Sequence, residues 1–408
     1  MLGARSLQAM DQLTSPGPLD GIRVVDLTTA RSGPTCVRQL VDMGATAIRV
    51  GAANRGDLAG SDGWNLHRGK RSVLLDLTTP AGLEVLQRLA ADADVFVENF
   101  RPGVKHRLKI DPESLWSINP RLIYGSISGF GQTGPYADRP GVDQIAQGLA
   151  GLMSVTGPSG TGPWRVGIAI SDTVSGTFLA QAIVAALFAR TRTGRGQWVH
   201  TSLLETMVNI MDFQAARYLN EGEVPGQAGN DHPTLFPMGT YRTADGHINI
   251  AASLDFDAFA RAVGRAEWMT DDRFSSFRVR MQNRSALEAA VDEVLRQEPT
   301  DHWVEILNRV GIPAGPVLAV DETFADPQVQ HLSLSSVVPG PGGAEPVTLL
   351  RHPVTFTDTP TSLDDGPPTL GQHTIEVLGE LGYSPEEIAA LIESGAASVA
   401  TRSGARVV

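Results

Sequence analysis

One aspartate, Asp172, stands in a sequence context that could carry covalent chemistry. It follows a short apolar run at Val166–Ile170 and precedes three small residues, Thr173, Ser175 and Gly176. Backbone amides around a carboxylate hold it ionised, and small neighbours let a substrate carbonyl approach it. The same position suits a helix N-cap, because aspartate accepts hydrogen bonds from the first free amides of a helix. The isolated segment leaves both interpretations open.

The segments around Asp172 predict two strands and a helix that would position it. Val166–Ile170 has the composition of a buried strand, and Phe178–Ala189 predicts an apolar helix that ends near Arg190. A loop with two glycines leads to a further strand at Gln197–Leu203. Asp172 is therefore expected at a junction between a strand and a helix.

Composition limits the class of protein. The chain has 408 residues, of which 42% are hydrophobic and 19% charged, which is typical of a globular protein with room for two cores. Its net charge of -12 argues against general binding to nucleic acid or to an anionic membrane. The N-terminus does not resemble a signal sequence and no apolar run reaches about 20 residues, so a soluble protein is expected. The single cysteine, Cys36, excludes an internal disulfide and fits a cytoplasmic location.

The N-terminal half alternates between strands and helices. The predicted strands are Ile22–Leu27, Ala45–Val50, Ser72–Leu75, Val95–Glu98 and Leu122–Ser126, and the predicted helices are Thr35–Met43, Pro80–Ala91 and Pro112–Ile118. A loop is expected at Trp64–Arg71. Short repeated units of this kind favour an α/β fold with a doubly wound, mostly parallel, Rossmann-like sheet, whose ligands bind at the carboxyl ends of the strands.

Several common site motifs are absent or incomplete. Gly129–Gly134 matches the GxGxxG pattern, but Pro135 and Pro140 prevent the helix whose N-terminus would meet a pyrophosphate. The segment is therefore interpreted as a loop and not as a nicotinamide site. The sequence contains no GxSxG elbow, no HExxH and no paired cysteines, so no metal site is expected.

The second half predicts a smaller domain and a returning segment. Residues 18–220 would form the N-terminal part of a large α/β domain, 221–239 a linker or active-site loop, 240–328 a small α+β domain, and 329–394 a C-terminal segment that returns to the large domain. The elements expected after residue 239 are a hairpin turning at Asp245–Gly246, helices at Phe256–Val263, Ser285–Arg296, Asp301–Val310, His373–Leu381 and Pro385–Ser394, and strand-like segments at Val347–Leu350 and Val354–Phe356. Residues 1–17 and 395–408 are expected to be weakly ordered tails.

Taken together, the motifs carry a family resemblance. In order they are Gly21–Thr28 with Ser32–Pro34, Gly69–Ser72 with Leu75–Leu77, Val97–Gly103, Gly129–Pro135, Asp172 and Thr193–Gln197. This order resembles the family III CoA-transferases of the CaiB/BaiF type, which include formyl-CoA transferase and crotonobetainyl-CoA:carnitine CoA-transferase. The resemblance runs from Leu19 to about Leu381.

The resemblance implies a role for Asp172 and a reaction. Asp172 would be the nucleophile of an acyl-CoA:carboxylate CoA-transferase, ionised at neutral pH because an ordinary aspartate has a pKa near ~4. It would pass through an aspartyl anhydride and an aspartyl-CoA thioester while CoA moves from an acyl-CoA to a small carboxylic acid. Coenzyme A is then a substrate, no metal or other cofactor takes part, and the family's interlocked homodimer is expected.

The resemblance also implies contacts with CoA. The residues at CoA-contacting positions are Leu75, Asp76, Leu77, Thr78, Asn99, Phe100, Arg101 and Arg107. Two basic clusters are expected near strand ends, where they could bind phosphates. The first is His67–Arg71, with Lys70 and Arg71, and the second consists of Arg101, Lys105 and Arg107. The alternative for both clusters is a solvated basic face. Arg31 and Ser32 fall beside the thioester, and Asp143 falls on an active-site glutamate.

Departures from formyl-CoA transferase leave the substrate open. Gly51 and Ala52 replace a Glu-Arg pair, and Arg55 is one candidate for the missing cation. Only Gly226–Gly229 stands where that enzyme has a glycine-run lid. Arg31 adds a charge that could hold the second carboxylate of a dicarboxylic acyl group. Its alternatives are a surface arginine and an arginine turned to a CoA phosphate.

Two other functions remain to be weighed. Racemases of 2-methylacyl-CoA share this fold and use a Gly-His-Asp motif to exchange a proton, but this chain has Gly141-Val142-Asp143, and valine cannot carry a proton. A non-catalytic acyl-CoA-binding partner protein is the third interpretation. The sequence favours transfer.

Overall fold

The structure is a computed structural model that describes residues 17–53, 58, 60–361 and 363–399. These residues divide into two compact units. The first contains the described residues up to 152 together with 166–215 and those from 333 onward, and the second contains 153–165 and 216–332. The chain passes between the units near α7 (Leu152–Val155) and α10 (Asp212–Glu221). Most of the expected N-terminal tail lies outside the described residues.

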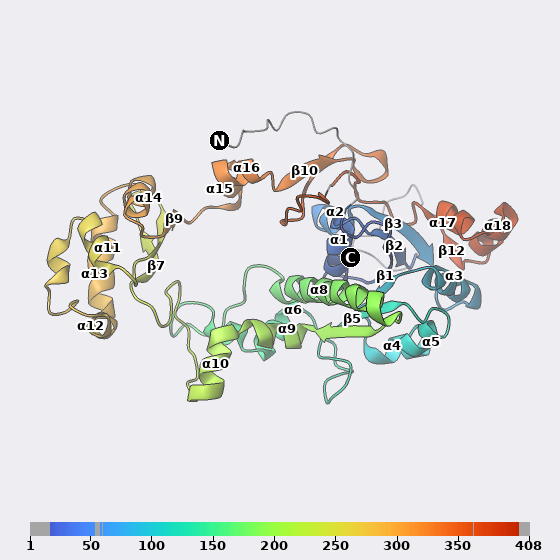
Figure 1. Cartoon of the computed structure of the whole chain (residues 1–408), viewed down its shortest axis with the longest axis horizontal. Coiled ribbons are helices and arrows are strands. Elements are labelled where there is room, and N and C mark those ends of the chain that lie inside the picture. The colour runs from blue at the N-terminus through green and yellow to red at the C-terminus, as the bar shows by residue number, and fades with distance from the viewer. Residues whose placement is uncertain (1–16, 54–57, 59, 362, 400–408) are drawn as a thin grey trace, which may run out of the picture. The chain divides into compact units, whose positions relative to one another are not determined.

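The first unit is built on a seven-stranded sheet (Figure 1). The strands lie in the order β12, β3, β2, β1, β4, β5, β6, and all are parallel except β12. Their bounds are β1 (Arg23–Leu27), β2 (Thr46–Gly51), β3 (Lys70–Leu75), β4 (Val95–Glu98), β5 (Ile123–Ser128), β6 (Trp198–Ser202) and β12 (Ala397–Ser398). The predicted mostly parallel α/β sheet is therefore confirmed. The strand order reverses between β1 and β4, which is where such sheets bind ligands.

Helices cover both faces of this sheet because its strands are apolar on both sides. On β1, Val24 packs into one core and Val25 into the other, and Val95 and Phe96 divide in the same way on β4. The first core includes residues of α1 (Ser32–Asp42), α6 (Asp143–Leu149), α8 (Ile170–Thr193) and α9 (Leu203–Ile210). The second includes residues of α3 (Pro80–Ala91), α5 (Pro112–Trp116), α17 (Thr374–Glu380) and α18 (Pro385–Glu393). The sheet is doubly wound.

Four local predictions need correction. Residues 166–169 form no strand, because the backbone amide of Val166 bonds the Gln147 side chain instead of a neighbouring strand, and α8 already begins at Ile170. Helix α2 (Gly60–His67) runs into the loop expected at Trp64–Arg71, and residues 354–356 form no strand. The ordered chain also continues beyond residue 395, since β12 pairs with the end of β3. Helix α4 (Pro102–Arg107) follows β4 without having been predicted.

The second unit contains a small antiparallel sheet with its own core. Strands β7 (Met238–Arg242), β8 (His247–Ala251) and β9 (Ala314–Pro316) pair in that order, and the predicted hairpin between β7 and β8 is confirmed. The helices of this unit are α11 (Phe256–Ala262), η1 (Ala266–Met269), α12 (Phe277–Gln282), α13 (Arg284–Leu295), α14 (Thr300–Arg309), α15 (Val320–Ala325) and α16 (Pro327–Leu332). Residues from 333 onward, with β10 (Ser335–Val338), η2 (Pro341–Gly343) and β11 (Val347–Leu350), belong to the first unit.

Helix α8 is long, although it contains no unbroken apolar run of about 20 residues. By length and composition alone it is the one described helix that could cross a membrane. Its Leu179, Ile183 and Leu187 are buried in the first core, however, and Arg190 donates to Asp94 at 2.7 Å. These are the contacts of a core helix.

Helices α1 and α8 are in close contact at Gly176. A Cβ atom at this position would lie 2.5 Å from the carbonyl oxygen of Ser32 and 2.8 Å from Cβ of Thr35. Glycine is therefore required by packing here. Asp172 lies one turn earlier on the same helix, so the packing at Gly176 places it near the start of α1.

We expect Gly176→Ala to destabilise the protein by about 1–3 kcal/mol, because the added methyl group forces the two helices apart. The free energy of unfolding in urea measures this. Gly379→Ala in α17 is the matched control, since a Cβ there meets no atom within 4 Å. Equal stability of the two variants would contradict the packing argument.

Candidate active site

Asp172 is the third residue of α8 and is partly buried. The N-cap of this helix is Ala169, which has no capping side chain, so the cap interpretation of Asp172 is wrong. Its carboxylate lies instead in the first turn, where the positive end of the helix dipole favours an anion.

The start of α1 supplies two neighbours of Asp172. Ser32, buried at the first position of α1, lies close enough for its side chain to lower the pKa of the Asp172 carboxyl. Arg31, the residue before it, lies close enough for its charge to act on the same carboxylate. The structure therefore brings together three residues that the sequence singled out separately.

Asp143 holds the start of α8 from the other side. It is the first residue of α6, and its carboxylate accepts bonds from the backbone amide of Ser171 at 2.9 Å and from the Ser171 hydroxyl at 2.8 Å. Gln147 donates to its second oxygen at 2.7 Å. Asp143 thereby caps α8 in place of an N-cap side chain, and its negative charge faces Asp172.

These surroundings raise the pKa of Asp172 to about 6. Burial is the main cause and the charge of Asp143 adds to it, while the charge of Arg31 and the side chain of Ser32 oppose the rise. The expected value near ~4 is therefore corrected. A carboxylate with this pKa is still mostly ionised at pH 7, and its higher basicity makes it a better nucleophile.

The loop of residues 129–135 supports Asp143. As predicted, no helix begins in it among the described residues, and Gly131 and Gly134 have positive φ angles of 102° and 94°. A Cβ on Gly129 would lie 2.8 Å from Cα of Gly141. This close backbone contact places the loop against the segment that leads into α6.

A second support joins the loops after β1 and β4, where the strand order reverses. The Asn99 side chain accepts from the backbone amide of Thr29 at 2.9 Å and donates to its carbonyl at 2.7 Å. Ala30 then adopts a φ of 59°, a left-handed conformation that costs a non-glycine residue about 1–2 kcal/mol. The two bonds to Thr29 hold this turn and thereby set the direction of the backbone at Arg31.

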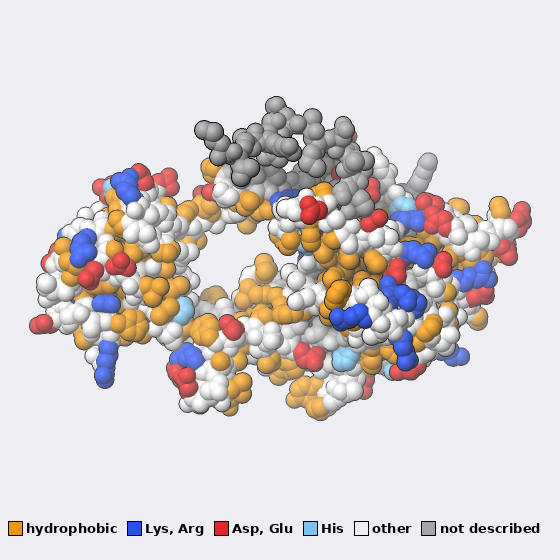
Figure 2. All heavy atoms as spheres, in the orientation of Figure 1, with side chains coloured by type: hydrophobic (Ala, Val, Ile, Leu, Met, Phe, Trp, Pro, Cys, Tyr) orange, Lys and Arg blue, Asp and Glu red, His pale blue; other side chains and the backbone are white. Residues whose placement is uncertain are grey.

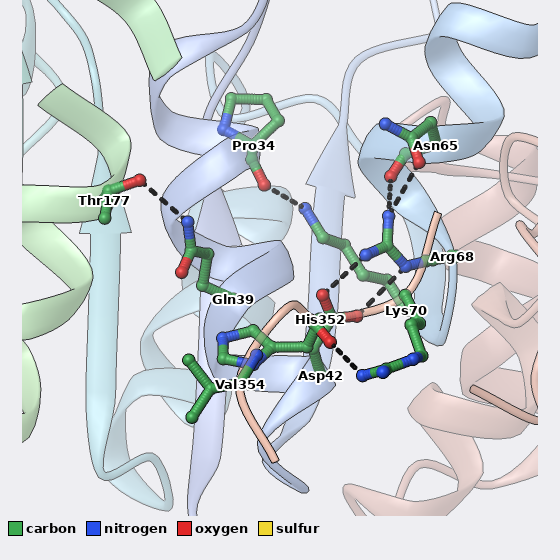
Figure 3. A network of polar contacts seen from close by, with 10 residues as sticks. Pro34, Gln39, Asp42, Asn65, Arg68, Lys70, Thr177, His352 and Val354 are labelled. Carbon is green, nitrogen blue, oxygen red and sulfur yellow. Dashed lines mark hydrogen bonds and ion pairs between the residues drawn. The ribbon is translucent and has the colours of Figure 1, made fainter. Parts of the chain in front are cut away.

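Two predicted CoA contacts must be revised because their charges are buried in ion pairs. Lys70 donates to Asp26 at 2.8 Å. It also donates to the Pro34 carbonyl at 3.2 Å (Figure 3). Lys105 donates to Glu98 at 2.9 Å, and both side chains are fully buried. We therefore leave Lys70 and Lys105 out of the CoA site.

Arg71 is excluded by its place in the sheet. It lies at the amino end of β3 and pairs with Glu376 and Glu380 of α17, at 2.9 and 2.8 Å. Ligands bind at the opposite, carboxyl end. Arg68 of the same cluster is buried and donates two hydrogen bonds to the Asp42 carboxylate (Figure 3).

The remaining predicted CoA contacts lie at the carboxyl end of the sheet. Leu75 ends β3, and Asp76, Leu77 and Thr78 form the turn that follows it, with the Asp76 carboxylate accepting from Thr78. Phe100 is partly exposed, and Arg101 and Arg107 are exposed at the start and end of α4. Arg55 lies outside the described residues.

Sequence reasoning missed Asp62. This residue of α2 forms an ion pair with Arg31, whose Nη2 lies 2.5 Å from Asp62 Oδ2. It precedes the loop expected at Trp64–Arg71, where no element was predicted, and no spacing pattern links residues 31 positions apart.

Comparison with known proteins identifies the family. Residues 19–374 match the family model of CoA-transferase family III. The chain belongs to this family. It is similar to the succinate–glutarate CoA-transferase of Agrobacterium fabrum, with 36% identity over 89% of this chain and 96% of that protein, and to the succinyl-CoA:glutarate CoA-transferase of Homo sapiens, with 31% identity over 93% and 89%. A crystal structure of a CaiB/BaiF family protein from Brucella suis matches with a TM-score of 0.81 and 36% identity over 90% of this chain and 100% of that one.

The transferase moves CoA between an acyl-CoA and a carboxylic acid, which confirms the predicted reaction class. This reaction class replaces the interpretations of the chain as a racemase and as a non-catalytic partner protein.

The pKa of Asp172 predicts a pH dependence. If Asp172 is the nucleophile, as the sequence predicts, its protonation prevents attack, and the rate of CoA transfer should fall about tenfold for each pH unit below about 6. Asp143→Asn removes a charge that raises this pKa and should move the midpoint to lower pH, whereas Arg31→Gln removes a charge that lowers it and should move the midpoint up. Pre-steady-state rates between pH 4.5 and 8 provide the measurement. A midpoint that neither variant moves would show that another group controls the rate.

Proposed function

We propose that Asp172 is the nucleophile of the transfer reaction. Its carboxylate oxygen attacks the thioester carbonyl of the donor, the C–S bond breaks, and CoA leaves as the thiolate, so that an acyl-aspartyl anhydride forms. The thiolate then attacks the aspartyl carbonyl and expels the donor acid, which leaves an aspartyl-CoA thioester. The acceptor carboxylate attacks this thioester and the steps run in reverse. No net proton is taken up or released.

The support for this role is the setting of Asp172 in the first turn of α8, between Ser32 and Asp143. Ser32 lowers the pKa of its carboxyl, and Asp143 raises its basicity while holding the first turn of α8. A carboxylate is a weak nucleophile, so orientation must supply much of the rate, and oriented groups reach effective molarities of about 10⁵ M or more. Asp143 acts in this scheme as a positioning residue.

We propose that CoA lies along the carboxyl edge from β3 to β4. The exposed turn at 76–78, Asn99, Phe100 and the cations Arg101 and Arg107 line this edge. Arginine binds phosphate through paired hydrogen bonds, so the two arginines supply the contacts that Lys70 and Lys105 cannot make. Arg101 and Arg107 stand here as the proposed phosphate ligands.

Mixing the protein with an acyl-CoA and recording its denatured mass tests the nucleophile. We expect a CoA adduct on the peptide that contains Asp172. In Asp172→Ala the adduct should disappear and turnover should fall by at least about 10³-fold, because the covalent route is lost. Asp20→Ala, a substitution of an exposed aspartate, is the control. Undiminished thioester exchange in Asp172→Ala would contradict the mechanism.

The substrates that we propose are dicarboxylic acids and their CoA thioesters. Two similar proteins carry names that specify succinate and glutarate. The cation of Arg31 beside Asp172 agrees with this class, because it could bind a carboxylate that takes no part in the reaction.

We propose further that the transferase is a homodimer of interlocked chains. The support is a set of apolar side chains exposed on α6, α8 and α9, the helices of the first core (Figure 2). They are Val142 (62% exposed), Ile145, Leu149, Phe188 (64%) and Val208. Exposed apolar surface of this kind marks a contact with another protein.

Light scattering should give twice the mass of one chain. We expect Phe188→Glu to weaken the dimer at least about tenfold, because it places a charge in an apolar contact. Ile375→Glu on α17, which is 57% exposed on the other face of the sheet, should leave the dimer intact. A monomer in the wild-type protein would end this proposal.

A further inference from the structure

The guanidinium of Arg31, beside the proposed nucleophile, is paired with a carboxylate of the chain itself. Arg31 Nη2 lies 2.5 Å from Asp62 Oδ2, and the two side chains are 29% and 46% exposed. Among the described residues this is the ion pair that Arg31 makes. Its charge also reaches Asp172. Asp62 thus sits where a second carboxylate near the reacting centre would bind.

The two partners of this ion pair are held differently. On the side of Arg31, Asn99 clamps Thr29 with two bonds, and the Arg31 carbonyl accepts from Thr35 at 2.8 Å. Asp62 lies in the first turn of α2, which is exposed, whereas the other end of α2 is buried at Leu66. The backbone at Arg31 is therefore held in place, while the exposed side chain of Asp62 can turn into solvent.

Charge balance decides what the site accepts. Asp172 and Asp143 already place two carboxylates near the substrate, and Asp62 offsets the charge of Arg31. An ion pair between exposed side chains is weak, so a carboxylate delivered by a bound substrate can replace Asp62. An acyl group that ends in a methyl group cannot do so.

We propose that Arg31 and Asp62 form a displaceable ion pair that selects dicarboxylic substrates. The distal carboxylate of the acyl group takes the place of Asp62 on Arg31, and Asp62 moves into water. This inference rests on the proposed role of Asp172, because the distal carboxylate can reach Arg31 only when the thioester lies against that residue.

The test compares succinyl-CoA with butanoyl-CoA, which has a methyl group where succinyl-CoA has the distal carboxylate. The readout is the rate at which each substrate forms the CoA adduct on the protein. At pH 8.5, where Asp172 stays ionised even without the charge of Arg31, Arg31→Gln should lower kcat/KM for succinyl-CoA about 10- to 100-fold, the usual effect of losing a charged hydrogen bond, and that for butanoyl-CoA less than about threefold.

Asp62→Asn should have the opposite effect. Without the competing carboxylate, KM for succinyl-CoA should fall about 3- to 10-fold, and the gain should vanish in the double variant with Arg31→Gln. Arg23→Gln and Asp92→Asn are matched controls, because these residues form an exposed ion pair at the amino ends of the strands, away from the site. Both controls should react like the wild type.

The outcomes separate this inference from the proposed function. Equal losses on both substrates in Arg31→Gln would place the arginine on CoA, which both substrates share, and would overturn the ion-pair proposal. A loss of succinyl-CoA activity in Asp62→Asn would overturn it as well. If the wild-type protein forms no adduct at Asp172 with either substrate, the nucleophile itself is wrong.

Discussion

The site depends on the close packing of α1 against α8. At Gly176 the two helices leave no room for a side chain, since a Cβ would meet the Ser32 carbonyl at 2.5 Å. Asp172 lies one turn before this contact, so the packing fixes its distance from Ser32 and Arg31. The small residues that suggest space for a substrate thus have a second role. Ser175, for example, is buried and bonds with Thr206.

Buried ion pairs tie strands of the sheet to one another and to the helix after β4. Asp26 and Lys70 join β1 to β3, and Glu98 and Lys105 join β4 to α4. Burial would raise the pKa of Asp26, but the charge and hydrogen bond of Lys70 outweigh it and hold that pKa below its usual value. Removing one partner of such a pair costs about 3–5 kcal/mol, because the other charge stays buried. The motifs that contain these lysines therefore serve the architecture.

Elements with a strong local pattern could be predicted from the sequence. Pro80–Ala91 and Val95–Glu98 have the predicted bounds, because apolar periodicity and a proline at the first helical position are local signals. The strand expected at Val166–Ile170 failed for a non-local reason. An apolar run becomes a strand only where a neighbouring strand accepts its hydrogen bonds, and here Gln147 takes the amide of Val166.

The sequence by itself determined the family, the reaction class and the parallel sheet, because the order of motifs and the periodicity of apolar residues are properties of the chain. Tertiary structure decided which cations are free and how basic the nucleophile is. Lys70 looks like a phosphate ligand until Asp26, 44 positions away, is found beside it. Burial and charge depend on residues that are distant along the chain, so the raised pKa of Asp172 and the pairing of Arg31 with Asp62 arise only in the fold.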